Sequence, residues 1–232
     1  LKELQRLYRV RLDHAIAAHR ELMDLAGQGG LVAGERRSAL EALRALDRHH
    51  LEQVRAVHDE FEARWQPSRR EAVARQRQEL AAELAAAAVV VIAGGHVAVL
   101  LNRLRLFDLR PLLTGKTIVA WSAGAMVAAR WIVLFHDSPP WGAGNAEVLD
   151  VGLDLCGDIL PLPDVRRRLR MDDPRRVELL ARRFAPLECV GLDETSRLSR
   201  GADGWRGRGA HRFGWAGDVK VVGRSGWEDL SS

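Results

Sequence analysis

The sequence predicts an α/β domain built on a mostly parallel sheet flanked by helices, with an α-helical hairpin in front of it. Apolar residues recur at helical spacing throughout residues 1–66, whereas short β-branched runs alternate with helical segments after residue 87. Such alternation is typical of a parallel sheet covered by helices on both faces. Pro67 lies between the two patterns. We therefore expect two domains, a helical hairpin over 1–66 and an α/β domain over 67–232.

The hairpin is expected to consist of two amphipathic helices separated by the glycine-rich segment 27–30. Each helix carries one apolar stripe, and these stripes need a partner surface. That partner is either the following domain or a second copy of the chain, which would form a homodimer through the N-terminal helices. The stripes comprise Leu4, Tyr8, Leu12, Ala15, His19, Leu22 and Ala26, then Leu40, Leu43, Leu46 or Asp47, His50 or Leu51, Val54, Val57, Phe61 and Trp65.

The α/β domain is expected to begin with a helix that opens at a capping box, Ser68 to Glu71, and runs to about Ala86. A buried strand over 87–93 follows, and it ends at Gly94-Gly95-His96. Further strands are predicted at 117–121, 132–136, 158–162 and 188–192, helices at 97–106, 123–131 and 173–184, and a loop at 137–146. The last 40 residues are expected to form one or two hairpins, with a turn at 203–204 and edge strands within 211–222.

Composition argues against several classes of protein. The net charge is only +4, and acidic residues are interleaved with basic ones along the N-terminal helices, so nucleic acid is not an expected partner. No apolar run is long enough to span a bilayer, and there is no signal-peptide pattern. Cys156 and Cys189 stand far apart without metal-ligand spacing, which fits a reducing cytoplasm. Neither a metal nor an organic cofactor is implied.

The segment 117–130, TIVAWSAGAMVAAR, is where the sequence indicates chemistry. A short β-branched run leads directly into Ser122-Ala123-Gly124 and then into a helix start. A strand that turns sharply into a helix with Ser at the turn is the layout of a nucleophile elbow. The residue two places before the Ser is usually Gly, whereas here it is Ala120. The other interpretation is an ordinary strand–helix turn with a buried Ser.

These residues resemble the cyanophycinase and aspartyl-dipeptidase group of serine peptidases. The resemblance covers roughly 81–198: a strand ending in Gly94-Gly95, a Leu-rich helix, the elbow WSAGA at 121–125, and a late strand ending in GLDE at 191–194. It implies a class I glutamine-amidotransferase-like α/β fold and hydrolysis of dipeptides or polymers that contain aspartyl residues. By this resemblance Ser122 is the nucleophile, and the backbone N–H groups of Gly95 and Ala123 hold the oxyanion.

The sequence also departs from that family. The family's catalytic His stands between the elbow and the last strand and is followed by Arg-x-Arg. In the matching segment here, 164–170, Arg168 and Arg170 are in register but Asp164 takes the place of the His. With a pKa near 4, an ordinary Asp is a poor base for a hydroxyl group. The family's first strand and glycine turn are also missing unless they lie upstream of Leu1, and helices stand in their place.

A substitute base is needed if the chain is active, and His136 is the candidate. His136 ends the strand predicted after the elbow helix and Asp137 follows it, and carboxyl ends of strands face the site in open α/β sheets. His96 and His211 are the other histidines considered, and a hydrogen bond within the loop is the competing interpretation of His136. Glu194 is expected to orient the base, or to cap its turn.

Two functions remain open at this point. The first is a serine hydrolase that attacks an amide carbonyl through Ser122, with a small peptide or an acidic small molecule as substrate. In that case Arg168 and Arg170 would bind a substrate carboxylate. The second is a catalytically degenerate family member that binds a ligand or a partner protein. Glutamine amidotransfer is disfavoured because that chemistry uses a Cys nucleophile, and neither cysteine is at an elbow.

Overall fold

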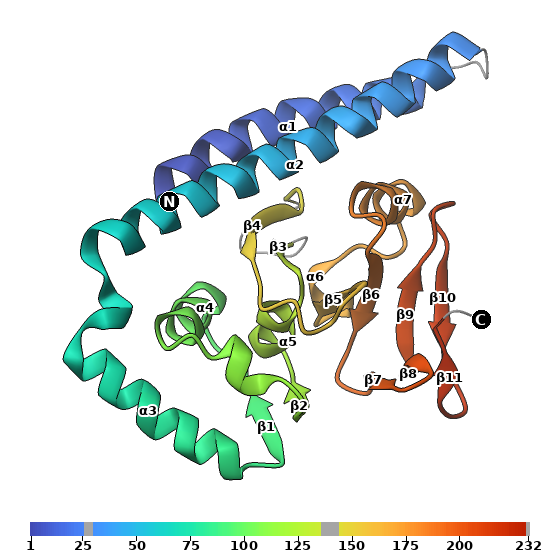
Figure 1. Cartoon of the computed structure of the whole chain (residues 1–232). Helices are drawn as coiled ribbons and strands as arrows, with labels where there is room; N and C mark the ends of the chain where they lie inside the picture. The colour runs from blue at the N-terminus through green and yellow to red at the C-terminus, as the bar shows by residue number, and fades with distance from the viewer. Residues whose placement is uncertain (26–29, 136–143, 231–232) are drawn as a thin grey trace.

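The structure is a computed structural model that describes residues 1–25, 30–135 and 144–230 (Figure 1). Its helices are α1 (Lys2–Asp24), α2 (Gly30–Trp65), α3 (Glu71–Ala86), α4 (Val97–Leu106), α5 (Ala123–Ala128), α6 (Val165–Arg168) and α7 (Pro174–Arg183), with 3-10 turns η1 (Pro67–Arg69) and η2 (Arg110–Leu113). Its strands are β1 (Val89–Ile92), β2 (Thr117–Ala120), β3 (Trp131–Leu134), β4 (Glu147–Val151), β5 (Ile159–Pro163), β6 (Glu188–Leu192), β7 (Arg197–Gly201), β8 (Gly204–Arg208), β9 (Ala210–Phe213), β10 (Val219–Val222) and β11 (Glu228–Asp229). The predicted α/β class and N-terminal helical hairpin are confirmed.

Parallel pairing joins β1 to β2 and β5 to β6, and these pairs carry the candidate site residues at their carboxyl ends. On the other side of β6, β9 and β10 add antiparallel strands, so the sheet order is β10-β9-β6-β5. Antiparallel pairs β3–β4 and β11–β8–β7 form separate small sheets. The predicted C-terminal hairpin is present, since β7 and β8 are joined through Ala202-Asp203.

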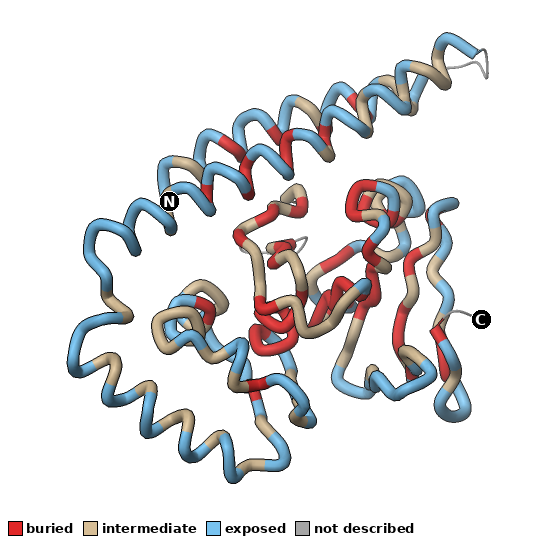
Figure 2. Tube along the Cα trace, viewed as in Figure 1, coloured by how far each residue is buried: buried red, intermediate tan, exposed pale blue. Residues whose placement is uncertain are grey.

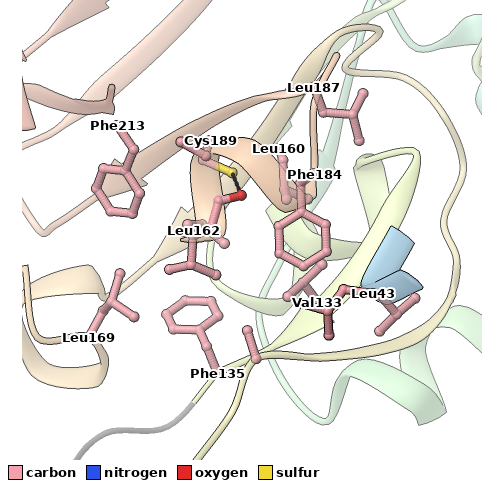
Figure 3. Close-up of a cluster of buried hydrophobic side chains, with 14 of the residues drawn as sticks. Leu43, Val133, Phe135, Leu160, Leu162, Leu169, Phe184, Leu187, Cys189 and Phe213 are labelled. Atoms are coloured by element: carbon pink, nitrogen blue, oxygen red, sulfur yellow. Dashed lines mark hydrogen bonds between the residues drawn. The ribbon is translucent and has the colours of Figure 1, made fainter. Parts of the chain in front are cut away.

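The hairpin of α1 and α2 packs on its own α/β domain. It crosses β4 and α7, with its buried residues on the side that faces them (Figures 1 and 2). Leu43 lies in the same buried cluster as residues of the α/β domain such as Val133 and Phe184 (Figure 3). Leu12 and Ile16 of α1 belong to this cluster as well. The central parts of the predicted apolar stripes are therefore covered within one chain, whereas Phe61 and Trp65 at the end of α2 are 53% and 51% exposed.

A buried ion pair fixes the hairpin to the domain. Arg183 of α7 donates through Nε and Nη2 to the two carboxylate oxygens of Asp47 in α2, each at 2.7 Å, and the two side chains are 1% and 0% exposed. Tyr8 of α1 donates to the same carboxylate at 2.7 Å, and Arg183 Nη1 donates to the carbonyl of Ala146 at 2.8 Å. Because the charges are both paired and hydrogen-bonded, this contact sets how the hairpin is oriented on the domain.

A second polar contact ties the other end of α2 to α4. Arg105 donates to both carboxylate oxygens of Asp150 at 2.8 Å, and His58 lies 2.9 Å from the same carboxylate. Burial raises the pKa of Asp150, but the hydrogen bonds with His58 and Arg105 lower it by more. The pKa of Asp150 therefore lies below its usual value. His58 thus makes a polar contact that joins α2 to β4.

Two sequence-based expectations about local structure were wrong. Ser68 does not form a capping box with Glu71: Ser68 lies in η1 and donates to Glu62, and the N-cap of α3 is Arg70, without a side-chain hydrogen bond. The extra 3-10 turn displaces the helix start past the Ser. The helix predicted at 123–131 ends at Ala128, because the chain already enters β3 at Trp131.

Two elements were missed. Strand β4 escaped prediction because the carboxylates Glu147 and Asp150 interrupt its apolar pattern, and these carboxylates bind Arg9 and Arg105 from distant segments. The short helix α6 follows β5 within an Arg-rich run that offers no apolar periodicity.

The Asp47–Arg183 pair leads to the first prediction. Asp47→Ala should lower the free energy of unfolding by about 3–5 kcal/mol, because it leaves the Arg183 guanidinium buried without its counter-charge. Urea denaturation at neutral pH measures the change. The matched control is Glu3→Ala, which removes an ion pair whose side chains are 77% and 71% exposed; its effect should stay below about 1 kcal/mol. Equal effects for the two variants would contradict the prediction.

Candidate active site

Ser122 occupies the turn between β2 and α5, as the sequence predicted. It is exposed, and its backbone has φ 53° and ψ −126°, outside the regions that residues with a Cβ normally adopt. Gly124 N donates to Trp121 O at 2.9 Å and Met126 N to Ser122 O at 3.2 Å, so the helix starts directly at the turn. A short polar side chain is thereby held at the end of the strand, open to solvent.

Two glycines allow the backbone to close around this turn. A Cβ at position 124 would lie 1.9 Å from the carbonyl oxygen of Ile92, the last residue of β1. At position 94, a Cβ would lie 3.0 Å from Ser122 Cβ and 3.1 Å from Ser122 Oγ. The loop after β1 therefore touches the Ser side chain. Gly95, the next residue, has φ +138°, a conformation that side chains rarely permit.

Gly94, Gly95 and Ala123, the residues expected to hold the oxyanion, thus surround or adjoin Ser122. A Cβ at position 94 would also be 3.9 Å from the amide nitrogen of Ala123. Ser122 and the two backbone segments expected to act as donors come together from strands β1 and β2, which are paired in parallel. In this half of the site, a strand turns directly into a helix with Ser122 at the turn.

Asp164 lies at the carboxyl end of β5, in a left-handed conformation with φ 60° and ψ 38°. Its carboxylate accepts a hydrogen bond from Arg168 Nε at 3.3 Å. Arg170 lies with its Nε 3.8 Å from an oxygen of Asp172. Both arginines expected to bind substrate are thus beside carboxylates of the protein itself, Arg168 beside Asp164 and Arg170 beside Asp172.

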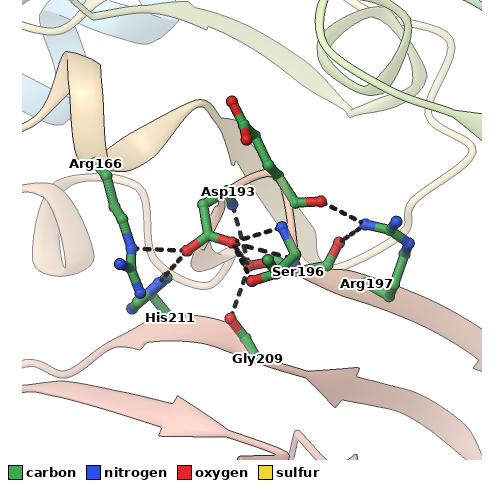
Figure 4. A network of polar contacts seen from close by, with 8 residues as sticks. Arg166, Asp193, Ser196, Arg197, Gly209 and His211 are labelled. Atoms are coloured by element: carbon green, nitrogen blue, oxygen red, sulfur yellow. Dashed lines mark hydrogen bonds and ion pairs between the residues drawn. The ribbon is translucent and has the colours of Figure 1, made fainter.

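The most developed polar cluster belongs to a residue that sequence reasoning passed over, Asp193 (Figure 4). It follows β6 as Asp164 follows β5, since Pro163 and Leu192 are paired in register. One carboxylate oxygen lies 3.1 Å from His211 Nε2 and 2.8 Å from Arg166 Nε. The other accepts bonds from the backbone and side chains of Thr195 and Ser196 at 2.9–3.1 Å.

This cluster shifts the pKa of Asp193. Partial burial raises it, but the hydrogen bonds from His211, Ser196 and Thr195 outweigh that effect and hold the pKa well below its usual range. The carboxylate therefore stays ionised and fixes the turn after β6. The sequence Asp-Glu-Thr-Ser at 193–196 carried a signal for this, because Asp accepts hydrogen bonds from backbone N–H groups two and three residues on.

Glu194, the expected orienting residue, is exposed in that turn, and its carbonyl oxygen accepts from Arg197 Nη1 at 3.0 Å. His136, the expected base, lies outside the described residues. His96 is the N-cap of α4 and accepts from Val99 N at 3.5 Å, while His211 is buried on Asp193. The described histidines considered for the role are therefore engaged in structural contacts.

The cysteines are unsuited to nucleophilic chemistry. Burial raises the pKa of Cys156 to about 11 and that of Cys189 to about 12, so both stay protonated thiols at neutral pH. Within the described ranges there is no group of three or more His, Cys, Asp or Glu side chains placed to hold a metal ion. Nor does any described helix have the length and apolar character needed to cross a membrane.

Comparison with known proteins places the chain in context. The model of peptidase family S51 matches residues 42–159, half of the chain. That match includes Gly94, Gly95 and Ser122 and ends before Asp164. A solved structure, described as a peptidase from an acI-B1 Actinobacterium, has 18% sequence identity and a TM-score of 0.46. The alignment covers 66% of this chain, which spans 64% of the length of that chain. None of the curated proteins matches the sequence.

The close approach at Gly124 leads to the second prediction. Gly124→Ala should destabilise the protein by about 1–3 kcal/mol or more, because the new methyl group collides with the Ile92 carbonyl. In contrast, Gly34→Ala in α2, where a Cβ meets nothing within 4 Å, should stabilise by about 0.5–1 kcal/mol. Thermal unfolding of both variants tests the pair. A stable Gly124→Ala protein would refute the close packing of β1 against α5.

Proposed function

The chain belongs to peptidase family S51, and from this premise we propose that it is an active serine hydrolase with Ser122 as nucleophile. The reaction is attack on an amide carbonyl. The family supports a serine-peptidase-like hydrolase in general terms, and the geometry around Ser122 supports the specific assignment of the nucleophile.

The observation that carries this proposal is the strained backbone of Ser122. A residue with a Cβ in such a conformation costs on the order of 1–3 kcal/mol and is found chiefly at functional sites. An ordinary strand–helix turn would relieve this cost by placing Gly at the position. Here Gly stands instead at 94 and 124, where neighbouring segments approach, and the strained position keeps a hydroxyl group.

The proposed reaction is acyl transfer. Ser122 Oγ attacks the carbonyl carbon, its proton passes to a base, and the N–H groups of Gly95 and Ala123 stabilise the oxyanion. The proton then goes to the leaving amine, and water hydrolyses the acyl-enzyme ester. We assign the base to His136 and an orienting role to Glu194 on the sequence reasoning alone.

The proposed substrate is a small peptide or an acidic small molecule, with Arg168 and Arg170 as partners for its carboxylate. In the free protein these arginines lie beside Asp164 and Asp172. A substrate carboxylate would therefore have to replace those contacts. A bidentate, charge-assisted hydrogen bond from an arginine to the substrate carboxylate is strong enough to compete with them. The proposal includes a cytoplasmic location, which the two free cysteines support.

One observation favours a second function, a degenerate enzyme that binds a ligand or partner. Asp164 replaces the family's His and accepts a hydrogen bond from Arg168. This carboxylate already accepts from Arg168, and an ordinary carboxylate is a poor base for a hydroxyl group, so this position would not activate Ser122. The strained turn would then be retained from an active ancestor.

Labelling with a fluorophosphonate probe separates the two functions. The wild type should label stoichiometrically and Ser122→Ala should not, because the probe reacts with an activated serine hydroxyl. His136→Ala should label about a hundred-fold more slowly or less, whereas His49→Ala, a change at an exposed position of α2, should label like the wild type. A folded wild type that does not label would refute the active-hydrolase proposal.

Replacing Asp164 by His provides an independent prediction. If His136 serves as the base, Asp164→His should change the labelling rate by no more than a few-fold. A gain of about a hundred-fold or more would instead reveal a triad that had lost its base at this position. Asp172→His, a change at a neighbouring exposed carboxylate, is the control for non-specific effects of the new imidazole.

A further inference from the structure

A cavity of about 240 Å³ lies between α1 of the hairpin and α7 of the α/β domain. Ile16, Met23, Leu179 and Leu180 form the apolar part of its lining. A cavity of about 150 Å³ is enough to hold benzene, and 240 Å³ corresponds to roughly eight water molecules. The space therefore suits a small organic molecule of about ten non-hydrogen atoms. None of the described candidate-site residues lines it, so the cavity is separate from the Ser122 turn.

His19 of α1 is the polar side chain that distinguishes this cavity. It lines the cavity and is only 9% exposed. Within residues 1–25, 30–135 and 144–230, no group forms a hydrogen bond or an ion pair with its ring. His50 of α2, which is also buried, lies 3.1 Å from the Gln5 side-chain oxygen. Buried polar side chains are nearly always hydrogen-bonded, so the ring of His19 is available to a molecule in the cavity.

The charged groups that surround His19 favour an anion. Burial is the main cause that lowers its pKa, and the carboxylate of Glu178 in α7 opposes this effect. The guanidiniums of Arg20 in α1, Arg182 in α7 and Arg36 in α2 lower the pKa further. His19 is therefore neutral at physiological pH and offers one N–H donor. Three positive charges and one negative charge act on it, so a negative ligand is attracted here.

The carboxylates that line the cavity already have partners within the protein. Asp24 is paired with Arg175 across the gap between α1 and α7. Glu178 accepts from Arg182 Nε at 2.9 Å, and Asp173 accepts from the first N–H groups of α7 as its N-cap. A cationic ligand would have to displace these contacts, which disfavours it.

Arg20 has a different kind of partner. It lines the cavity and donates through Nη2 to the amide oxygen of Asn145 at 3.0 Å. In the part of the chain that the structure describes, it forms no ion pair with a carboxylate. A guanidinium held only by a neutral amide gains from a carboxylate ligand, because the hydrogen bond is then charge-assisted.

We propose that the cavity between α1 and α7 is a binding site for a small carboxylate with an apolar body. Arg20 and the N–H of His19 donate to the carboxylate, and the apolar body packs against Ile16, Met23 and Leu180. Since α1 belongs to the hairpin and α7 to the α/β domain, the bound ligand links the two. The site is additional to the one around Ser122.

Isothermal titration calorimetry at neutral pH tests this proposal with benzoate, hexanoate, benzamide and the benzylammonium ion. Benzoate or hexanoate should bind with a Kd of about 1 mM or less, as expected for a ligand of about nine non-hydrogen atoms. Benzamide and benzylammonium have the same size as benzoate but carry no negative charge. They should bind at least about ten-fold more weakly, because they lose the charge-assisted hydrogen bonds.

Two matched variants locate the site. Arg20→Gln should weaken carboxylate binding by about ten-fold or more and remain folded by circular dichroism, since the side chain is exposed. Arg11→Gln, also at an exposed position of α1, should bind like the wild type. Arg11 precedes Arg20 by about two and a half helical turns, so it lies on the opposite face of the helix.

The affinity for the carboxylate should also depend on pH. A bound carboxylate raises the pKa of His19, so binding should tighten by about three-fold or more between about pH 8 and pH 5.5. The probes stay ionised over this range, because a carboxylic acid has a pKa near 4. His19→Gln should abolish this pH dependence.

Three results would overturn the proposal. The first is that neither carboxylate binds with a Kd below about 10 mM, which is weaker than a site of this size should allow. The second is that benzamide or benzylammonium binds as tightly as benzoate. The third is that Arg20→Gln binds carboxylates like Arg11→Gln, which would place any binding elsewhere. Because the readout is the heat of binding, it does not depend on whether Ser122 is catalytic.

Discussion

The salt bridge between Asp47 and Arg183 is the contact on which the arrangement of this chain depends. It joins residues 136 positions apart, and Tyr8 and the Ala146 carbonyl complete its hydrogen bonds. A buried charge without a partner is very costly, so neither the hairpin nor α7 can shift without the other. The apolar contacts around the pair drive the packing of the hairpin on the domain, but they do not specify its orientation. The ion pair selects one orientation of the hairpin, and with it the position of β4, whose Val148 N donates to Tyr8.

The Ser122 turn depends on a different constraint, which is close approach of backbone. Three segments meet there: the end of β1, the glycine loop after it and the first turn of α5. Glycine at 94 and 124 makes the meeting possible, and Ser122 bears the resulting strain. Residues 42–159, which match the S51 family, contain all of these elements. The turn therefore lies within the part of the chain that the family model matches.

The second half of the site is formed by charged residues at the carboxyl ends of β5 and β6. At the ends of β5 and β6, carboxylates are each held by arginine: Asp164 by Arg168, and Asp193 by Arg166. His211 adds to the second of these pairs. Such ion pairs fix the loops after the two strands. The hydrogen bonds to Asp193 also hold its pKa well below the usual range, which suits a binding surface better than a general base.

The sequence by itself determined the α/β class, the helical hairpin, most strand and helix positions, and the Ser122 turn. Each of these depends on residues close together in the chain: apolar periodicity, glycine placement and a β-branched run that leads into a small-residue helix. Only the tertiary structure decided that the central parts of the hairpin stripes are buried within the chain, that Asp193 rather than Glu194 organises the turn after β6, and that His19 lines a cavity between α1 and α7. These depend on contacts between residues distant in sequence, such as Asp193 with His211 and Asp47 with Arg183. Spacing along a chain carries no information about which distant charge will pair with which, because that choice is made by packing.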